Sequence, residues 1–321
     1  MKNILVTGGL GILGRSISIK LSKNSRYKIY ILDKDNSKKK IKTLIFKSNV
    51  KIIIGDFTHK KVISKIIKDY NINDVIHLGA TTQVLEAFNK PDLTYKNNLF
   101  GTINILECIR KSKKNINLIY SSSDKAYGEL KKKEYFENFP LKGDFTYDVS
   151  KSSSDLIAQS YAKTYKISVG IIRSGNIYGP GDFNMDRLIP HVIISCLKNK
   201  KPILRSNGKL IRDYIYVEDV AKAYISLMQY MNKSEEKLKI YNVGSKENLM
   251  VIDLVNIILN ILNKNNLKPK IKNISTVEIK KQKLNYRKIK KELNWEPKVN
   301  IYDGIKETVK WYKKYLKLFN L

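Results

Sequence analysis

Apolar runs of strand length alternate with helix-like segments through the first half of the chain. The expected strands cover residues 3–7, 28–32, 50–54, 74–78, 116–120 and 168–172. The expected helices cover residues 11–23, 59–69, 91–112 and 148–165. Because each crossover between parallel strands carries a covering helix, this alternation predicts a parallel sheet with helices on both faces. The predicted fold class is therefore α/β, with a Rossmann-type doubly wound sheet.

The pattern loosens after about residue 173 into shorter strands and helices. We expect a dinucleotide-binding domain at residues 1–172 and a smaller, mixed α/β substrate-binding domain at residues 173–321. Some segments near residues 211–245 should return to the first domain. No internal repeat or low-complexity linker separates the two, so they should pack directly and leave a cleft between them.

The charge of the chain is strongly basic, at +32, from 61 Lys and Arg residues against 29 Asp and Glu residues. Basic domains often bind nucleic acid through its phosphates. Here the lysines are spread over almost every segment, which favours solvated surface positions, so nucleic acid is not an expected partner. Four of the eight arginines lie close together in the sequence: Arg173, Arg187, Arg205 and Arg212. Arginine binds phosphate bidentately, so this group suggests a phosphate-bearing ligand.

No apolar run reaches membrane-spanning length, and the first strand follows Lys2 and Asn3 without room for a signal peptide. Cys108 and Cys196 are the only cysteines, and both lie in apolar, helix-like surroundings. Two such thiols predict reduced, structural cysteines and a cytoplasmic protein. No metal ion is expected.

A glycine-rich loop joins the first expected strand to the first expected helix. Residues 7–14 read Thr-Gly-Gly-Leu-Gly-Ile-Leu-Gly, which places Gly8, Gly11 and Gly14 at the spacing of a dinucleotide-binding loop. Such glycines permit a tight turn, close approach of a pyrophosphate and close packing of the helix on the strand. The helix N-terminus then supplies amide donors for the phosphates.

Two carboxylates follow neighbouring strands. Asp33 ends the second expected strand, 19 residues after Gly14, where it would bind the adenosine ribose and repel a 2′-phosphate. This favours NAD over NADP, although the adjacent Lys34 keeps NADP open. Asp56 follows the third strand and has two interpretations, a contact with the adenine amine or a cap for the helix that begins near Thr58.

The spacing Tyr-x-x-x-Lys places Tyr147 and Lys151 on one helix face. Five tyrosines have a Lys four residues later, but only Tyr147 lies between a serine-rich strand end and the next buried strand. The Lys151 ammonium and the nicotinamide charge would favour the Tyr147 phenolate, and Lys151 would also hold the nicotinamide ribose. The hydroxyl of Ser123, at the strand end, would hydrogen-bond the substrate oxygen.

These residues together resemble the extended short-chain dehydrogenase/reductases that act on nucleotide sugars, and the resemblance covers nearly the whole chain. Two positions depart from the family pattern, because Gly79 replaces the usual Ala and Tyr216 stands where His is common. The resemblance rests on residues 7–14, His77-Leu78-Gly79-Ala80, residues 98–102, Ser123, Tyr147, Lys151, residues 173–180, residues 212–219 and Tyr241-Asn242-Val243-Gly244.

The resemblance also implies contacts that the residues alone do not. The implied substrate ligands are Asn176 at the diphosphate, Arg212 at a phosphate, and Arg187. Arg287 could reach the phosphates or lie on the surface. A homodimer is implied through a four-helix bundle of residues 91–112 and 148–165. Further NAD contacts are implied for Ile12, Leu13, Phe57, Leu78, Ala80 and Asn98.

The pair Asp124-Lys125 after Ser123 resembles the CDP-glucose 4,6-dehydratases, although the glycine loop departs from theirs. We therefore predict an NAD-dependent 4,6-dehydratase that converts an NDP-hexose to its 4-keto-6-deoxy form. Tyr147 would take the C4 hydroxyl proton during transient oxidation of C4. Asp124 would protonate the departing C6 hydroxyl, and Lys125 would take the C5 proton or stabilise the enolate.

Other interpretations of the same residues stay open. Asp124 could cap its loop, with Lys125 solvated. A nucleotide-sugar 4-epimerase needs no acid at C6, and the residues that follow the catalytic hydroxyl in those enzymes are usually small. A non-catalytic Rossmann protein that binds NAD or RNA is a further alternative.

Overall fold

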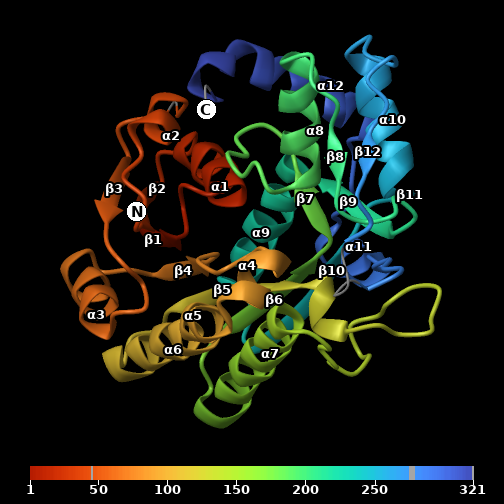
Figure 1. Ribbon diagram of the computed structural model, residues 1–321. Coiled ribbons are helices and arrows are strands. Elements are labelled where there is room, and N and C mark those ends of the chain that lie inside the picture. The colour runs from red at the N-terminus through yellow and green to blue at the C-terminus, as the bar shows by residue number, and fades with distance from the viewer. Residues whose placement is uncertain (45, 275–278, 320–321) are drawn as a thin grey trace.

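A seven-stranded parallel sheet forms the centre of the molecule (Figure 1). The computed structural model describes residues 1–44, 46–274 and 279–319. The strand order β10-β6-β5-β4-β1-β2-β3 reverses direction between β1 and β4, which opens a crevice at the carboxyl ends of these strands. The strands are β1 (Lys2–Thr7), β2 (Tyr27–Asp33), β3 (Val50–Ile54), β4 (Asp74–His77), β5 (Asn117–Ser123), β6 (Val169–Ser174) and β10 (Leu238–Val243).

Helices cover both faces of this sheet, as the alternation of strands and helices predicts (Figure 1). One face packs on α1 (Ile12–Ser22), α9 (Val217–Met231) and α11 (Arg287–Leu293). The other packs on α3 (Lys60–Asp69), α6 (Gly101–Ser112) and α7 (Thr146–Tyr165). Successive strand residues face opposite cores: Ile4 and Val6 pack with α1, whereas Leu5 packs with α3 and α6.

The second part of the chain builds a smaller mixed structure with its own core. Its three-stranded sheet contains β11 (Asn248–Met250), β9 (Ile211–Tyr216) and β7 (Asn176–Tyr178). A second pair joins β8 (Ile203–Leu204) to β12 (Lys270–Ile271). The helices are α8 (Leu188–Leu197), α10 (Val251–Ile261) and α12 (Ile301–Lys314). Between these segments the chain returns to the large sheet, where β10 pairs in parallel with β6.

The continuous helix expected over residues 91–112 is wrong in detail. The structure divides it into α5 (Pro91–Tyr95), a π-helical turn η1 (Lys96–Phe100) and α6. At this point the carbonyl oxygen of Asn98 accepts hydrogen bonds from the Thr102 hydroxyl at 2.6 Å and the Ser154 hydroxyl at 2.9 Å. These two hydroxyls thus bond a carbonyl oxygen that a regular helix would pair with a backbone N–H. Such π-helical turns often mark functional sites.

Short helices complete the fold. They are α2 (Lys38–Lys42), α4 (Val84–Asn89), the 3-10 turn η2 (Asp124–Tyr127) and the 3-10 turn η3 (Leu316–Phe319). Cys108 and Cys196 are both buried free thiols. Over the described ranges, no helix has the length and apolar character that crossing a bilayer requires.

Candidate active site

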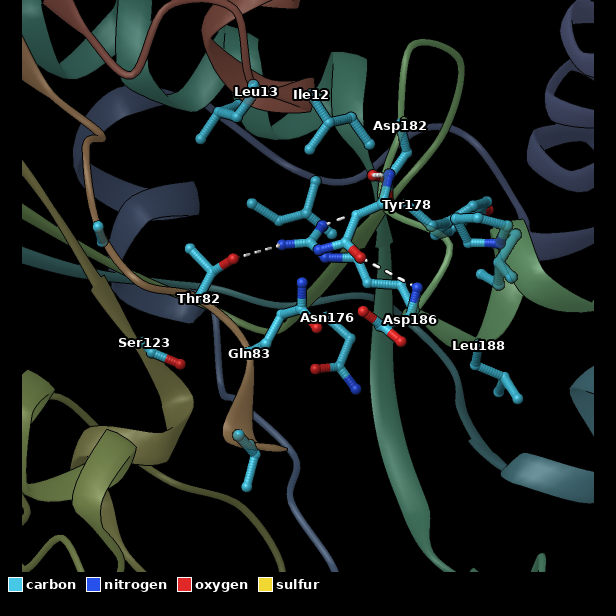
Figure 2. A pocket seen from close by; sticks show the side chains of 18 of the residues that line it. Ile12, Leu13, Thr82, Gln83, Ser123, Asn176, Tyr178, Asp182, Asp186 and Leu188 are labelled. Carbon is cyan, nitrogen blue, oxygen red and sulfur yellow. Dashed lines mark hydrogen bonds and ion pairs between the residues drawn. The ribbon is translucent and has the colours of Figure 1, made fainter. Parts of the chain in front are cut away.

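A cavity of about 1260 Å³ runs from the glycine loop to the smaller part of the molecule. Figure 2 shows its wall, with Ile12 and Leu13 of α1 on one side and Ser123, Asn176 and Asp186 around the rest. The cavity lies at the carboxyl ends of the parallel strands, where open α/β sheets bind their ligands. Its size is sufficient for more than one small molecule.

The glycine loop forms one end of this cavity and fits a dinucleotide. Gly8 has a φ of 65°, and a Cβ on it would lie 2.8 Å from the backbone nitrogen of Gly79. A Cβ on Gly14 would lie 2.5 Å from the Cα of Gly9. Side chains are therefore excluded, and Gly11 caps the N-terminus of α1 at the cavity wall. The exposed backbone and the helix terminus suit a pyrophosphate.

Asp33 lies at the same end, where β2 stops. Its Oδ2 accepts a hydrogen bond from the backbone N–H of Leu10 at 2.9 Å, and its Oδ1 accepts one from Asp35 at 3.0 Å. The carboxylate is thereby fixed beside the glycine loop and lines the cavity together with Lys34. A negative charge in this position suits a free ribose hydroxyl and disfavours a 2′-phosphate.

Asp56 and Asn98 do not line the cavity, whereas Phe57, Leu78 and Ala80 do. Asp56 accepts a hydrogen bond from the backbone N–H of Thr58 at 2.8 Å, which closes the turn before α3. The side chain of Asn98 holds the backbone of Thr81, at 2.7 and 3.0 Å, and the Ser150 hydroxyl at 2.8 Å. Asn98 therefore fixes the loop after β4 against α7.

Tyr147 and Lys151 both line the cavity from the first turns of α7 and are buried. Lys151 Nζ donates to the carbonyl oxygen of Ser121 at 2.9 Å, and burial lowers the pKa of Lys151 to about 8. Burial also raises the pKa of Tyr147, while a hydrogen bond with Ser123 opposes that change. The predicted hydroxyl, phenol and amine thus meet at one place.

Ser123 and Lys125 line the cavity, and Asp124 lies behind them. The Ser123 hydroxyl donates to Asp124 Oδ1 at 3.0 Å, and the backbone N–H of Lys125 donates to the Ser123 hydroxyl at 3.2 Å. Ser123 is therefore the cap of η2, and Lys125 is buried. The structure thus differs from the alternative in which Asp124 caps the loop and Lys125 is solvated. Burial raises the pKa of Asp124, which favours its protonated form.

The arginines divide into two groups. Arg187, Arg205 and Arg212 line the cavity, as does the predicted substrate ligand Asn176. Arg173 instead forms a buried bidentate ion pair with Asp155, at 2.9 and 3.0 Å. Arg287 is exposed at the start of α11 and does not line the cavity, so its position corresponds to the surface alternative.

Several cavity residues were not named as site residues from the sequence, although some of them lie in motifs such as the serine run before Asp124. They include Thr82, Gln83, Ser121, Ser122, Ser174, His191, Tyr214 and Lys272. Ser121, Ser122, Ser174 and Tyr214 lie on strands, His191 lies on α8, and the others lie in loops. Two buried carboxyls near the site, Asp148 and Asp213, were also not predicted.

The crevice, the glycine loop and the buried Ser-Tyr-Lys set define a Rossmann-type enzyme of the extended short-chain dehydrogenase/reductase class. A family model described as GDP-mannose 4,6 dehydratase matches residues 5–308. The chain belongs to that family.

Similar proteins include both dehydratases and epimerases. A trifunctional UDP-glucose 4,6-dehydratase/UDP-4-keto-6-deoxy-D-glucose 3,5-epimerase/UDP-4-keto-L-rhamnose-reductase of Arabidopsis thaliana is 30% identical over 97% of this chain, which spans 47% of that relative. A solved dTDP-glucose 4,6-dehydratase of Bacillus anthracis in complex with NAD is 28% identical, with a TM-score of 0.87 over 99% of this chain and 98% of that one. A solved UDP-glucose 4-epimerase of Thermotoga maritima with UDP-glucose is 26% identical, with a TM-score of 0.88 over 98% and 99%.

These findings confirm the predicted α/β fold and the predicted class, an NAD-dependent nucleotide-sugar dehydratase or epimerase. NAD is confirmed as the cofactor. The roles of individual site residues stay predictions.

Proposed function

We propose that this chain is an NAD-dependent nucleotide-sugar 4,6-dehydratase, and that Asp124 is the acid that releases water. The single observation that carries this choice is the buried carboxyl of Asp124, which lies behind the cavity wall and accepts a hydrogen bond from the Ser123 hydroxyl that forms part of that wall. An epimerase needs no acid at C6, so a carboxyl kept protonated by burial would have no task there. The dehydratases among the similar proteins support the same choice.

The proposed NAD site follows the glycine loop and Asp33. Gly8, Gly11 and Gly14 leave room for the pyrophosphate, and Asp33 would hold the adenosine ribose. The predicted neighbours Ile12, Leu13, Phe57, Leu78 and Ala80 would pack on the bound dinucleotide. When bound, NAD supplies transient oxidation at C4 of the sugar and the later reduction at C6.

Tyr147 is the proposed base for the C4 hydroxyl, and Lys151 its electrostatic partner. The ammonium would stabilise the phenolate and hold the nicotinamide ribose, because both groups line the same part of the cavity. The Ser123 hydroxyl, which contacts Asp124, would also hydrogen-bond the C4 oxygen of the sugar. Loss of the C4 hydroxyl proton to Tyr147, together with loss of the C4 hydride to NAD, would leave a ketone, which acidifies the hydrogen at C5.

The elimination would use Asp124 and Lys125. Removal of the C5 proton leaves the electron pair of the C5–H bond in an enolate. Expulsion of the C6 oxygen then forms a C5–C6 double bond. Asp124 would give its proton, through the Ser123 hydroxyl at the cavity wall, to the departing oxygen, which leaves as water. The C5 proton returns when C6 is reduced. Transfer of the proton held by Tyr147 to Asp124 would then restore the site after one turnover.

The substrate diphosphate would bind among the cavity arginines. Arg187 directly precedes α8, Arg212 lies on β9 and Asn176 begins β7, and all three line the cavity. Arg212 is buried at the cavity wall, where its guanidinium donates to the carbonyl oxygen of Ile211 at 3.0 Å. Arg205 also lines the cavity, although the sequence indicated it only as a member of the arginine group.

We also propose a homodimer through α7 and η1. The elements pack together, and both expose large apolar side chains, with Phe100 57% exposed and Leu156 51% exposed. Such side chains on adjoining helices suit a second copy of the same surface. The buried free thiols fit a reducing compartment, so the cytoplasm is the proposed location.

Replacement of Asp124 by Asn tests the dehydratase assignment. The variant should still bind NAD and oxidise C4, but water loss should fall by about 100-fold or more, because the amide cannot supply the proton. Mass spectrometry of products from CDP-, dTDP-, UDP- and GDP-hexoses measures water loss, and NADH absorbance measures oxidation. Undiminished water loss would remove Asp124 from the mechanism, and an isomer of unchanged mass from the unsubstituted protein would establish the epimerase.

A further inference from the structure

Asp148 is a buried carboxyl that none of the steps above uses. It is the third helical residue of α7, next to Tyr147, and only 1% of it is exposed. The backbone N–H of Phe145, which precedes the helix, hydrogen-bonds this carboxylate. Its Oδ2 is buried without a hydrogen-bond partner in the described part of the chain. One oxygen therefore caps the helix, and the other remains to interact with the site.

Asp148 lies against the turn that carries Asp124 and Lys125. The Ser152 hydroxyl ties the two elements together, at 2.7 Å from the carbonyl oxygen of Ala126 and 2.9 Å from that of Asp148. Lys125 lines the cavity and Asp148 does not, and the charge of Lys125 acts on the Asp148 carboxyl from the neighbouring turn. Both are buried, which strengthens the interaction between their charges.

Charged groups approach this place from three directions. Lys125 and Asp124 belong to η2, Asp144 precedes α7, and Asp124 in turn interacts with Arg212 and Asp213 on β9. Burial raises the pKa of Asp148 to about 7, and the Lys125 charge opposes this rise. A carboxyl with these surroundings can exchange a proton with an adjoining amine at neutral pH.

We propose that Asp148 is a positioning residue that accepts the proton of the Lys125 ammonium, so that the Lys125 amine can take the C5 proton of the sugar. The inference rests on the dehydratase function proposed above. The ammonium proton moves to Asp148, and the amine nitrogen then forms a bond to the C5 hydrogen as the C5–H pair enters the enolate. When C6 is reduced, Lys125 returns that proton to C5, and Asp148 returns its own to the amine.

The sequence leaves two roles open for Lys125, removal of the C5 proton and stabilisation of the enolate. The pairing with Asp148 favours the first. A lysine with its ordinary pKa of about 10.4 is protonated at neutral pH and cannot act as a base. An adjoining carboxyl that takes up the proton removes this obstacle without creating a net charge in the buried site. Lys125 therefore acts as the base at C5.

The alternative is that Asp148 only caps α7, and a matched variant separates the two roles. Asp148→Asn keeps an amide oxygen that can accept the Phe145 N–H, so the cap survives. Asp303 is the third residue of α12, where its Oδ2 accepts a hydrogen bond from Asn300 at 2.7 Å, and it is exposed. Asp303→Asn makes the same change at the same helical position away from the cavity.

The experiment measures the two halves of the reaction separately, with full-length protein, saturating NAD and the hexose nucleotide that the product screen identifies. In Asp148→Asn, NADH formation should stay within about twofold, whereas water loss should slow by about 100-fold. A substrate deuterated at C5 should slow water loss more in the variant than in the unsubstituted protein, because proton removal has become the slow step. Asp148→Glu, which restores a carboxyl, should recover part of the rate.

The pH dependence supplies a further readout. Water loss by the unsubstituted protein should level off above about pH 7, where Asp148 can take the proton. In Asp148→Asn the rate should keep rising above that pH instead of levelling off, because the amine must lose its proton to solvent.

Three results would overturn the proposal. Asp148→Asn could behave like Asp303→Asn, which would reduce Asp148 to a helix cap. It could lose NADH formation and water loss together, which would place its effect on Tyr147 or on the fold. The unsubstituted protein could lose no water from any hexose nucleotide, and then the dehydratase function fails first and the role of Asp148 with it.

Discussion

Tyr147 and Lys151 are buried one helical turn apart, and burial shifts their pKa values in opposite directions. It raises the pKa of the phenol and lowers the pKa of the amine to about 8. The active form of the pair has lost one proton in total, with the phenolate held beside the ammonium. Such a pair titrates as a unit, so its first proton loss governs the activity.

The rate of C4 oxidation should therefore rise as pH increases through about 8 and then level off. Lys151→Met removes the charge that stabilises the phenolate, so the rise should move above pH 10, towards the burial-raised pKa of Tyr147. First-turnover NADH formation at saturating NAD measures both profiles. An unchanged midpoint in Lys151→Met would show that the lysine does not tune the phenol.

At this scale the sequence predicts residues whose role follows from a local pattern. The glycine spacing, the strand-end Asp33 and the Tyr147-Lys151 spacing all lie at the cavity. Asp56 and Asn98 lie outside it, because their side chains satisfy nearby backbone groups instead. Asp148 was missed because sequence alone does not reveal that its carboxyl is buried against another element.

At the scale of elements, the ion pair between Arg173 and Asp155 joins β6 to α7. Arg173 also donates to the Tyr127 hydroxyl at 2.9 Å and to the carbonyl oxygen of Glu137 at 3.0 Å. The side chains of the pair are only 2% and 0% exposed. A residue that the sequence grouped with the phosphate-binding arginines thus fastens the loop after η2 to the sheet that carries Ser123.

Replacement of Asp155 by Ala should lower the free energy of unfolding by about 3–5 kcal/mol, because it leaves a buried, unpaired guanidinium. Urea unfolding followed by circular dichroism measures the change. Glu107→Ala, which breaks a partly exposed ion pair with Arg110, should cost at most about 1 kcal/mol. Equal costs for the two variants would contradict the structural role of the buried pair.

The elements of the first half were predictable because each has a strong local period. Expected strands such as 50–54 and 28–32 correspond to β3 and β2 within one residue at each end. The break at η1 was not predictable, since it depends on the Ser154 hydroxyl of α7 reaching the carbonyl oxygen of Asn98. Short pieces such as β7 and β8 carry too few residues to show a period.

At the scale of the whole molecule, side-chain contacts as well as the chain itself connect the large sheet with its helices to the smaller second part. The guanidinium of Arg15, on α1, lies 5.4 Å from the ring centroid of Phe183 and donates to the Thr43 hydroxyl at 2.5 Å. Phe183 in turn stacks on Phe319 near the end of the chain. These contacts could not be derived from local pattern, because they join residues far apart in the sequence.

The proposed dimer is tested at the same scale. Phe100→Asp with Leu156→Asp places two charges on the apolar surface of η1 and α7 and should convert a dimer to monomers with little effect on folding. Size-exclusion chromatography with light scattering measures the mass. Tyr302→Asp, an equally drastic change at a residue 46% exposed on α12, should leave the mass unchanged. A monomer before any substitution would contradict the dimer.

The most direct test of the dehydratase function follows one hydrogen atom. A hexose nucleotide deuterated at C4 is incubated with the protein and NAD, and the product is examined by mass spectrometry and NMR. A 4,6-dehydratase should yield a product that has lost one water and carries the deuterium at C6, because the hydrogen removed from C4 is delivered to C6. A product of unchanged mass with the deuterium still at C4 would contradict the dehydratase function and identify a 4-epimerase.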